Sequence, residues 1–104
     1  MYGVEKKKNI LDNLKNKKSH FYEPNLNNEL KFALKKKFTF SKKIPSYKDI
    51  STYIITVGTP LNNNKKIITS YIKQTSREIK KVLKKDDLII LRSTVKVGTT
   101  RKIV

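Results

Sequence analysis

The sequence contains no cysteine, no tryptophan and a single histidine, His20, among its 104 residues. Without cysteine it can form neither disulfides nor thiolate metal sites, and no thiol nucleophile can act in it. A lone histidine cannot build a zinc site. No stretch approaches the ~20 apolar residues that a membrane helix needs, and the first residues lack the apolar core of a signal peptide. We therefore expect a cytoplasmic protein with no metal site and no membrane span.

Acidic residues are also scarce: there are 8 against 25 basic residues, which gives a formal net charge of +17. An excess of this size usually suggests a polyanionic partner. However, arginine, whose rigid guanidinium group suits base and phosphate recognition, occurs only at Arg77, Arg92 and Arg101. The lysines are spread along the whole chain beside abundant asparagine. We therefore do not expect nucleic acid to be the partner, and keep a small lysine-rich nucleic-acid-binding module as the alternative function.

Runs typical of strands alternate with runs of helical spacing. The predicted strands are Tyr2–Val4, Phe38–Phe40, Thr52–Val57 and Leu88–Leu91, and the predicted helices are Lys6–Lys15, Leu26–Leu34 and Ile68–Leu83. We also expect Asn25 to cap the second helix, a brief turn or helix at Tyr47–Ile50 and the start of a helix at Gly98–Thr100. The alternation predicts an α/β fold with a parallel sheet.

The last two predicted strands are almost continuously hydrophobic, which is typical of parallel strands that are buried on both faces. The aromatic residues occur in strand-like or helix-periodic contexts, so we expect them in the core rather than exposed for stacking on bases. These residues are Phe32, Phe38, Phe40 and Tyr53.

Polar residues or glycine directly follow three of the predicted strands. They are Glu5, the segment Val57-Gly58-Thr59-Pro60, and Arg92-Ser93-Thr94. In an open parallel sheet, ligands bind outside the carboxyl ends of the strands. An acidic residue there can accept hydrogen bonds from a ribose, a glycine lets the backbone approach a ligand, and hydroxyl groups can bond to ribose or phosphate. Taken singly, the same residues also fit a solvated charge, a turn and a local cap.

Five segments carry a resemblance in combination. They are Gly3–Glu5, Phe21–Leu26, Ile55–Leu61, Ser70–Tyr71 and Arg92–Thr100. In this order and with these gaps, the chain resembles the UDP-glucose/GDP-mannose dehydrogenase family, in particular its UDP-glucose and UDP-N-acetylmannosamine branches. The resemblance implies one incomplete NAD-binding domain over residues 1–104. Its fold would be a partial Rossmann-type, doubly wound parallel sheet with flanking helices, without the first strand and the phosphate-binding turn.

The activity implied by the resemblance is the NAD-dependent, two-step oxidation of the C6 alcohol of a UDP-sugar to a carboxylate. By the same resemblance, Glu5 would hold the adenosine ribose and Val57–Pro60 would pass along the cofactor. Ser93 and Thr94 would lie near its nicotinamide half. No catalytic residue of the family falls in this chain, and homo-oligomers are expected only of the full-length protein.

The chain departs from the family pattern at several positions. Glu5 stands where aspartate is usual, and Ile10 where an arginine or lysine often lies, although Lys8 is close by. Lys96 and Val97 replace two prolines. The Gly-x-Gly-x-x-Gly turn and the family's catalytic cysteine and lysine are absent from the sequence. We therefore expect the isolated chain to bind NAD poorly and to turn nothing over.

Two further expectations accompany this interpretation. A sheet without its first strand exposes strand edges, which favours aggregation or partial disorder. An unrelated doubly wound protein that uses another nucleotide stays open as a third interpretation, because the phosphate-binding turn that would discriminate between them is not in the chain.

Overall fold

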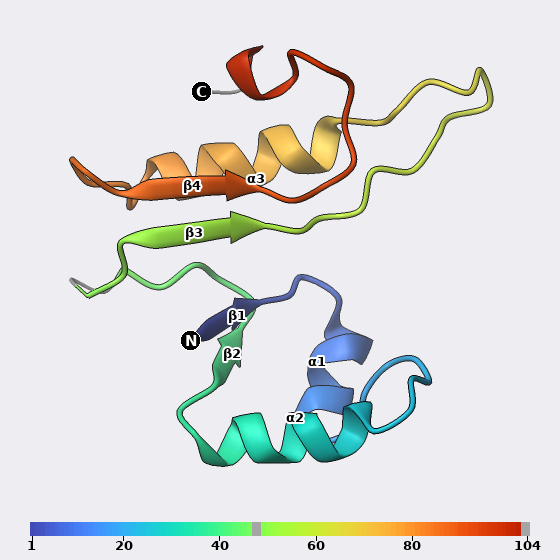
Figure 1. The fold of residues 1–104 in the computed structure, drawn as a ribbon, viewed down its shortest axis with the longest axis vertical. Helices are drawn as coiled ribbons and strands as arrows, with labels where there is room; N and C mark the ends of the chain where they lie inside the picture. Colours follow the sequence, from blue (N-terminus) through green and yellow to red (C-terminus); the bar gives the residue numbers. More distant parts are fainter. Residues whose placement is uncertain (47–48, 103–104) are drawn as a thin grey trace. The chain divides into compact units, whose positions relative to one another are not determined.

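The computed structural model of the protein describes residues 1–46 and 49–102. The chain divides into two compact units, an N-terminal unit of Met1–Ile44 and a C-terminal unit of Pro45–Val104. The first holds a strand, two helices and a strand, and the second holds a strand, a helix, a strand and a short 3-10 helix (Figure 1). The predicted order of elements is confirmed, and both strand pairs are parallel as expected.

The N-terminal unit is a parallel strand pair joined by two helices. Its elements are β1 (Tyr2–Val4), α1 (Lys8–Lys15), α2 (Leu26–Lys35) and β2 (Thr39–Ser41). Parallel neighbours cannot be joined by a tight turn, so the chain must cross over between them, and α1 and α2 form that crossover. Gly3 lies opposite Phe40, and the Glu5 N–H extends the pairing by donating to the Ser41 carbonyl at 3.0 Å.

After each helix of this unit, a lysine adopts the left-handed conformation that is usual for glycine at a helix C-terminus. After α1, Lys17 has φ 55°, and the N–H groups of Lys17 and Lys18 donate to the carbonyls of Leu14 and Asn13, both at 3.0 Å. Lys37, with φ 66°, follows α2 in the same way. The paired bonds satisfy carbonyls at the end of α1 that would otherwise lack partners.

The start of α2 differs in detail from the expectation. Asn25 does precede the helix, but it has φ 64° and its side chain makes no capping bond to the backbone. Its amide nitrogen donates instead to the Glu29 carboxylate at 3.2 Å, and its amide oxygen accepts from the Asn28 side chain at 3.1 Å. The expected side-chain cap is therefore wrong, because these side-chain partners lie within reach of the same amide.

The C-terminal unit has a second parallel pair with one helix against it. Its elements are β3 (Thr52–Ile55), α3 (Ser70–Lys80), β4 (Leu88–Leu91) and the 3-10 helix η1 (Thr100–Lys102). The buried core consists of Tyr53 and Ile55 on β3 and of Ile72 and Ile79 on α3, among the described residues. Ile72 and Ile79 are seven residues apart, two helical turns, and α3 contacts β3.

The prediction that both strands of this unit are buried on two faces is wrong. Burial alternates along β3, with Tyr53 and Ile55 buried and Ile54 56% exposed. On β4, Leu88 is 54% exposed, and Ile89 and Ile90 are exposed as well. Successive side chains of a strand point to opposite faces, and the contacts of α3 are with β3. The apolar face that carries Ile54, Leu88 and Ile90 therefore stays open.

The expectation for the aromatic residues holds for one of them. Tyr53 is only 8% exposed, and burial, with a smaller effect of the Asp87 carboxylate, raises the pKa of its hydroxyl above the ordinary 10.0. Phe38 and Phe40 are half-buried, and Phe32 is 55% exposed with the Lys36 ammonium 4.5 Å from its ring centroid. Phe32 as a core residue is wrong, because more than half of its surface is exposed, and the Lys36 ammonium lies over its ring. The turn expected at 47–50 lies partly outside the described residues.

Candidate functional site

Six of the seven predicted cofactor-binding residues lie just beyond the carboxyl ends of β3 and β4. Because the two strands are parallel, both chain segments leave the sheet at the same edge. Two side-chain bonds join the segments: the Ser93 hydroxyl donates to the Val57 carbonyl at 2.6 Å, and the Thr59 hydroxyl donates to the Thr94 carbonyl at 2.8 Å. The structure thus brings together the 57–60 and 93–94 segments, two of the three strand ends that the sequence singles out.

These bonds change what the hydroxyl groups can offer a ligand. A serine or threonine hydroxyl has one hydrogen to donate, and those of Thr59 and Ser93 are already donated to backbone carbonyls. Their oxygens keep lone pairs that can accept. The backbone N–H groups of Gly58, Thr59 and Thr94 have no hydrogen-bond acceptor within residues 1–46 and 49–102. At this edge the backbone N–H groups, together with the Thr94 hydroxyl, therefore supply donors for a polar ligand.

Nothing within the described part of the fold requires glycine at position 58. A Cβ atom there would meet no atom of residues 1–46 or 49–102 within 4 Å, and the backbone does not have the positive φ that favours glycine. Gly3 and Gly98 differ, since a Cβ at Gly3 would lie 2.9 Å from the Phe38 ring and Gly98 has φ 84°. The space beside Gly58 is open to a ligand that approaches the backbone.

Glu5, the seventh predicted residue, lies in the N-terminal unit directly after β1. Its Oε1 accepts a hydrogen bond from the Lys7 N–H at 2.8 Å, at the start of α1. The bond restricts the half-buried carboxylate to the strand end and leaves acceptor capacity on both oxygens. An acceptor in this place matches what the resemblance implies for a ribose.

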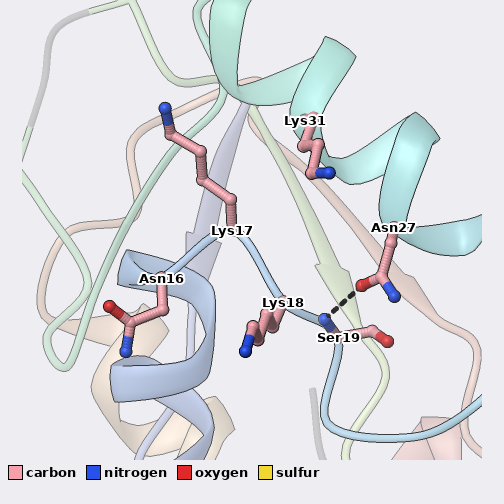
Figure 2. A pocket seen from close by; sticks show the side chains of 6 residues that line it. All are labelled: Asn16, Lys17, Lys18, Ser19, Asn27 and Lys31. Carbon is pink, nitrogen blue, oxygen red and sulfur yellow. Dashed lines mark hydrogen bonds between the residues drawn. The ribbon is translucent and has the colours of Figure 1, made fainter.

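The structure adds one pocket that no motif predicts. It lies in the N-terminal unit and is lined by polar and basic residues only: Asn16, Lys17, Lys18, Ser19, Asn27 and Lys31 (Figure 2). The signal available in the sequence is the lysine pair directly after the first helix. Over the same described residues, no three His, Cys, Asp or Glu residues gather in a way that could hold a metal ion. No helix in the described ranges combines the length and hydrophobicity needed to cross a membrane.

The Ser93 hydroxyl bond should stabilise the joined strand ends. We expect Ser93→Ala to lower the free energy of unfolding of the C-terminal unit by about 1 kcal/mol, the usual loss when one hydrogen bond is removed. Amide hydrogen exchange of the β3 and β4 residues measures this change. Thr94→Ala is the matched control, because no partner of the Thr94 hydroxyl lies in residues 1–46 or 49–102, and it should change exchange little. Equal effects of the two substitutions would contradict a specific role for the bond.

The comparison with protein families covers the whole chain. Residues 1–104 match the NAD binding domain of the UDP-glucose/GDP-mannose dehydrogenase family. The chain belongs to this family. Membership confirms the resemblance carried by the five sequence segments, and it makes the strand ends described above part of a domain that binds NAD in the family.

Individual relatives agree with this membership. The chain is 36% identical to the UDP-N-acetyl-D-mannosamine dehydrogenase of Campylobacter jejuni, over 96% of this chain and 24% of that protein. It is 32% identical to the NDP-N-acetyl-D-galactosaminuronic acid dehydrogenase of Ralstonia nicotianae, over 97% of this chain and 23% of that protein. The chain thus spans about a quarter of the length of these family members.

Solved structures establish the fold. The UDP-D-ManNAc dehydrogenase of Pyrococcus horikoshii matches with a TM-score of 0.89 and 26% identity, over 98% of this chain and 24% of that one. The GDP-mannose dehydrogenase of Pseudomonas aeruginosa matches with a TM-score of 0.86 and 26% identity, over 99% of this chain and 25% of that one. The predicted Rossmann-type α/β class is confirmed for this family member.

Proposed function

We propose that residues 1–104 supply part of the NAD site of a nucleotide-sugar dehydrogenase that oxidises the C6 alcohol of a UDP-sugar to a carboxylate. The observation that carries the proposal lies beyond the carboxyl ends of β3 and β4. There the 57–60 and 93–94 segments are joined by two hydrogen bonds, and backbone N–H groups without an acceptor in the described ranges are available to a ligand. Family membership supports NAD as the cofactor. The relatives favour a UDP-N-acetylmannosamine substrate over UDP-glucose.

Each residue has a role in this proposal that its geometry permits. Glu5 accepts from the adenosine ribose through the carboxylate that the Lys7 N–H restrains. Gly58 lets the cofactor approach the backbone, and Val57, Thr59 and Pro60 continue that surface. Ser93 and Thr94 would lie beside the nicotinamide half. When bound, NAD would supply the hydride acceptor for the two oxidation steps.

The pairing of the strands supports an incomplete domain. In a doubly wound sheet of order 3-2-1-4-5-6, the first strand separates the second from the fourth. A chain that provides strands two to five then forms two parallel pairs, and two parallel pairs are observed, β1 with β2 and β3 with β4. The domain over residues 1–104 would gain its phosphate-binding turn and catalytic residues from a longer protein. That protein is proposed to be cytoplasmic and homo-oligomeric.

The two halves of the cofactor allow a test on the chain as it is. We expect AMP to shift the amide NMR signal of Glu5, nicotinamide mononucleotide to shift those of Ser93 and Thr94, and NAD to shift both sets together with Gly58. Without the phosphate-binding turn, the dissociation constants should be about 1 mM or weaker. The NMR titration of the ¹⁵N-labelled chain measures both the sites and the affinities.

Gly58→Val serves as the blocking variant of the same experiment. Its side chain enters space where no atom lies within 4 Å of the new Cβ, so the fold should persist while the NAD shifts at Thr59 and Thr94 are lost. Unchanged NAD shifts in this variant, or no shifts at about 10 mM ligand, would contradict the proposed site. No NADH should form when the chain is mixed with a UDP-sugar and NAD, and sustained turnover would overturn the fragment interpretation.

A further inference from the structure

The polar pocket of the N-terminal unit lies apart in sequence from every residue of the proposed cofactor site. It is formed where the end of α1 and the turn after it meet the first half of α2 (Figure 2). No carboxylate is among its lining residues. Its composition, three lysines with two asparagines and a serine, is that of a site that offers hydrogen-bond donors.

The backbone around the pocket is held by specific bonds. In the turn after α1, the N–H groups of Lys17 and Lys18 donate to carbonyls of the helix, and these two bonds fix the backbone of both lysines. The next residue, Ser19, donates its N–H to the Asn27 Oδ1 at 2.8 Å, the bond drawn in Figure 2. This bond assigns the Asn27 oxygen to Ser19 and leaves the Asn27 Nδ2 as a donor. Lys31 follows Asn27 one turn later on the same side of α2.

The charges of the pocket have no internal compensation. The side-chain ammonium groups of Lys17, Lys18 and Lys31 contact no acceptor anywhere in the described ranges. The carboxylates close to them in sequence are engaged elsewhere, since Asp12 lies 3.8 Å from the Lys15 ammonium and Glu29 accepts from Asn25. Three lysines and an oriented amide thus line the pocket, and no carboxylate is among the lining residues.

We propose that this pocket binds the diphosphate group of a small molecule. A diphosphate has several acceptor oxygens and more than one negative charge, which suits a pocket with three lysines and no carboxylate in its lining. Lysine binds phosphate as a point charge on a flexible stem. The Lys17 and Lys18 side chains point in different directions (Figure 2), so the ligand must draw them together. Binding is therefore weak and decreases as salt screens the charges.

Pyrophosphate titrated into the ¹⁵N-labelled chain at low salt tests the proposal. We expect saturable shifts of the amides of residues 16–19 and of Asn27, with Gly58 and Thr94 unmoved, so that the result is independent of the cofactor site. Asn27→Asp keeps an oxygen for the Ser19 N–H but replaces the donor by a negative charge, and it should weaken binding about tenfold. Asn9→Asp makes the same change of charge at the start of α1 and should weaken binding less than about twofold.

A second pair of variants separates the pocket from the general positive charge. The triple substitution Lys17→Gln, Lys18→Gln and Lys31→Gln should abolish saturable binding. The control replaces Lys65, Lys66 and Lys73 by glutamine, which removes the same charge, and Lys65 shares the φ of 55° found at Lys17. Retained binding in the control supports the pocket. Equal loss in both triple variants would overturn the proposal, and so would binding of an oligonucleotide without binding of pyrophosphate.

Discussion

Replacing Ile72 by alanine should lower the free energy of unfolding of the C-terminal unit by about 2–5 kcal/mol, the range for large-to-small substitutions in a core. Ile72 is the largest fully buried side chain in the described structure, with 0% exposure, and the buried core around it has only three other members. Because so few buried side chains surround Ile72, little can move in to fill the cavity that the substitution leaves. Native-state hydrogen exchange of β3 and β4 amides measures the effect on this unit alone.

Ile54→Ala is the matched control for this experiment. It removes the same atoms from a side chain that is 56% exposed on the same small sheet, and it should cost less than about 1 kcal/mol. The amides of β1 and β2, which belong to the N-terminal unit, should be protected equally in both variants. If Ile72→Ala and Ile54→Ala had the same effect, the core assigned to the C-terminal unit would be incorrect.

Gly3→Ala should destabilise the N-terminal unit by about 1–3 kcal/mol through overpacking. The new Cβ would lie 2.9 Å from the Phe38 Cζ and 3.1 Å from its Cε2, and Phe38 also lies beside Phe40, with the ring centroids 6.2 Å apart. The ring must therefore move to accept a methyl group. Urea unfolding, monitored by hydrogen exchange of the β1 and β2 amides, measures the change in the free energy of unfolding.

A double-mutant cycle makes the cause of this loss testable. In a Phe38→Leu background the colliding ring atoms are absent, so Gly3→Ala should cost at least about 1 kcal/mol less than it does in the natural chain. Gly58→Ala, where the new Cβ meets nothing within 4 Å, should be neutral or slightly stabilising. An unchanged cost of Gly3→Ala in the Phe38→Leu background would show that the ring is not responsible.

The elements and their order were predictable because the local patterns are strong. Isoleucines at helical spacing indicated α3, and the runs at 52–57 and 88–91 indicated β3 and β4. The choice of the strand ends followed from one rule, that ligands of a parallel sheet bind beyond the carboxyl ends of its strands. The structure adds that two of these ends are joined, with Thr59 bonded to Thr94 and Ser93 to Val57.

Other features depend on partners that the local sequence does not encode. The hydrophobicity of Ile54 and Leu88 predicts burial, but burial also requires a covering element, and both side chains are exposed. The Ser93 hydroxyl was expected to be available to a ligand, yet its donor is used because the Val57 carbonyl is within reach. The left-handed Lys17 is likewise set by the bonds that end a helix, and nothing in a lysine predicts it.

The protein has both an open apolar face on β3 and β4 and a formal net charge of +17. Its tendency to self-associate should therefore depend on ionic strength. In dilute salt, repulsion between like-charged copies extends tens of ångströms and keeps the apolar faces apart. At about 0.1 M salt the repulsion is confined to about 10 Å, and the attraction between exposed isoleucine and leucine side chains is then opposed only at short range. Screening by salt thus weakens the repulsion that keeps the exposed apolar faces of two copies apart.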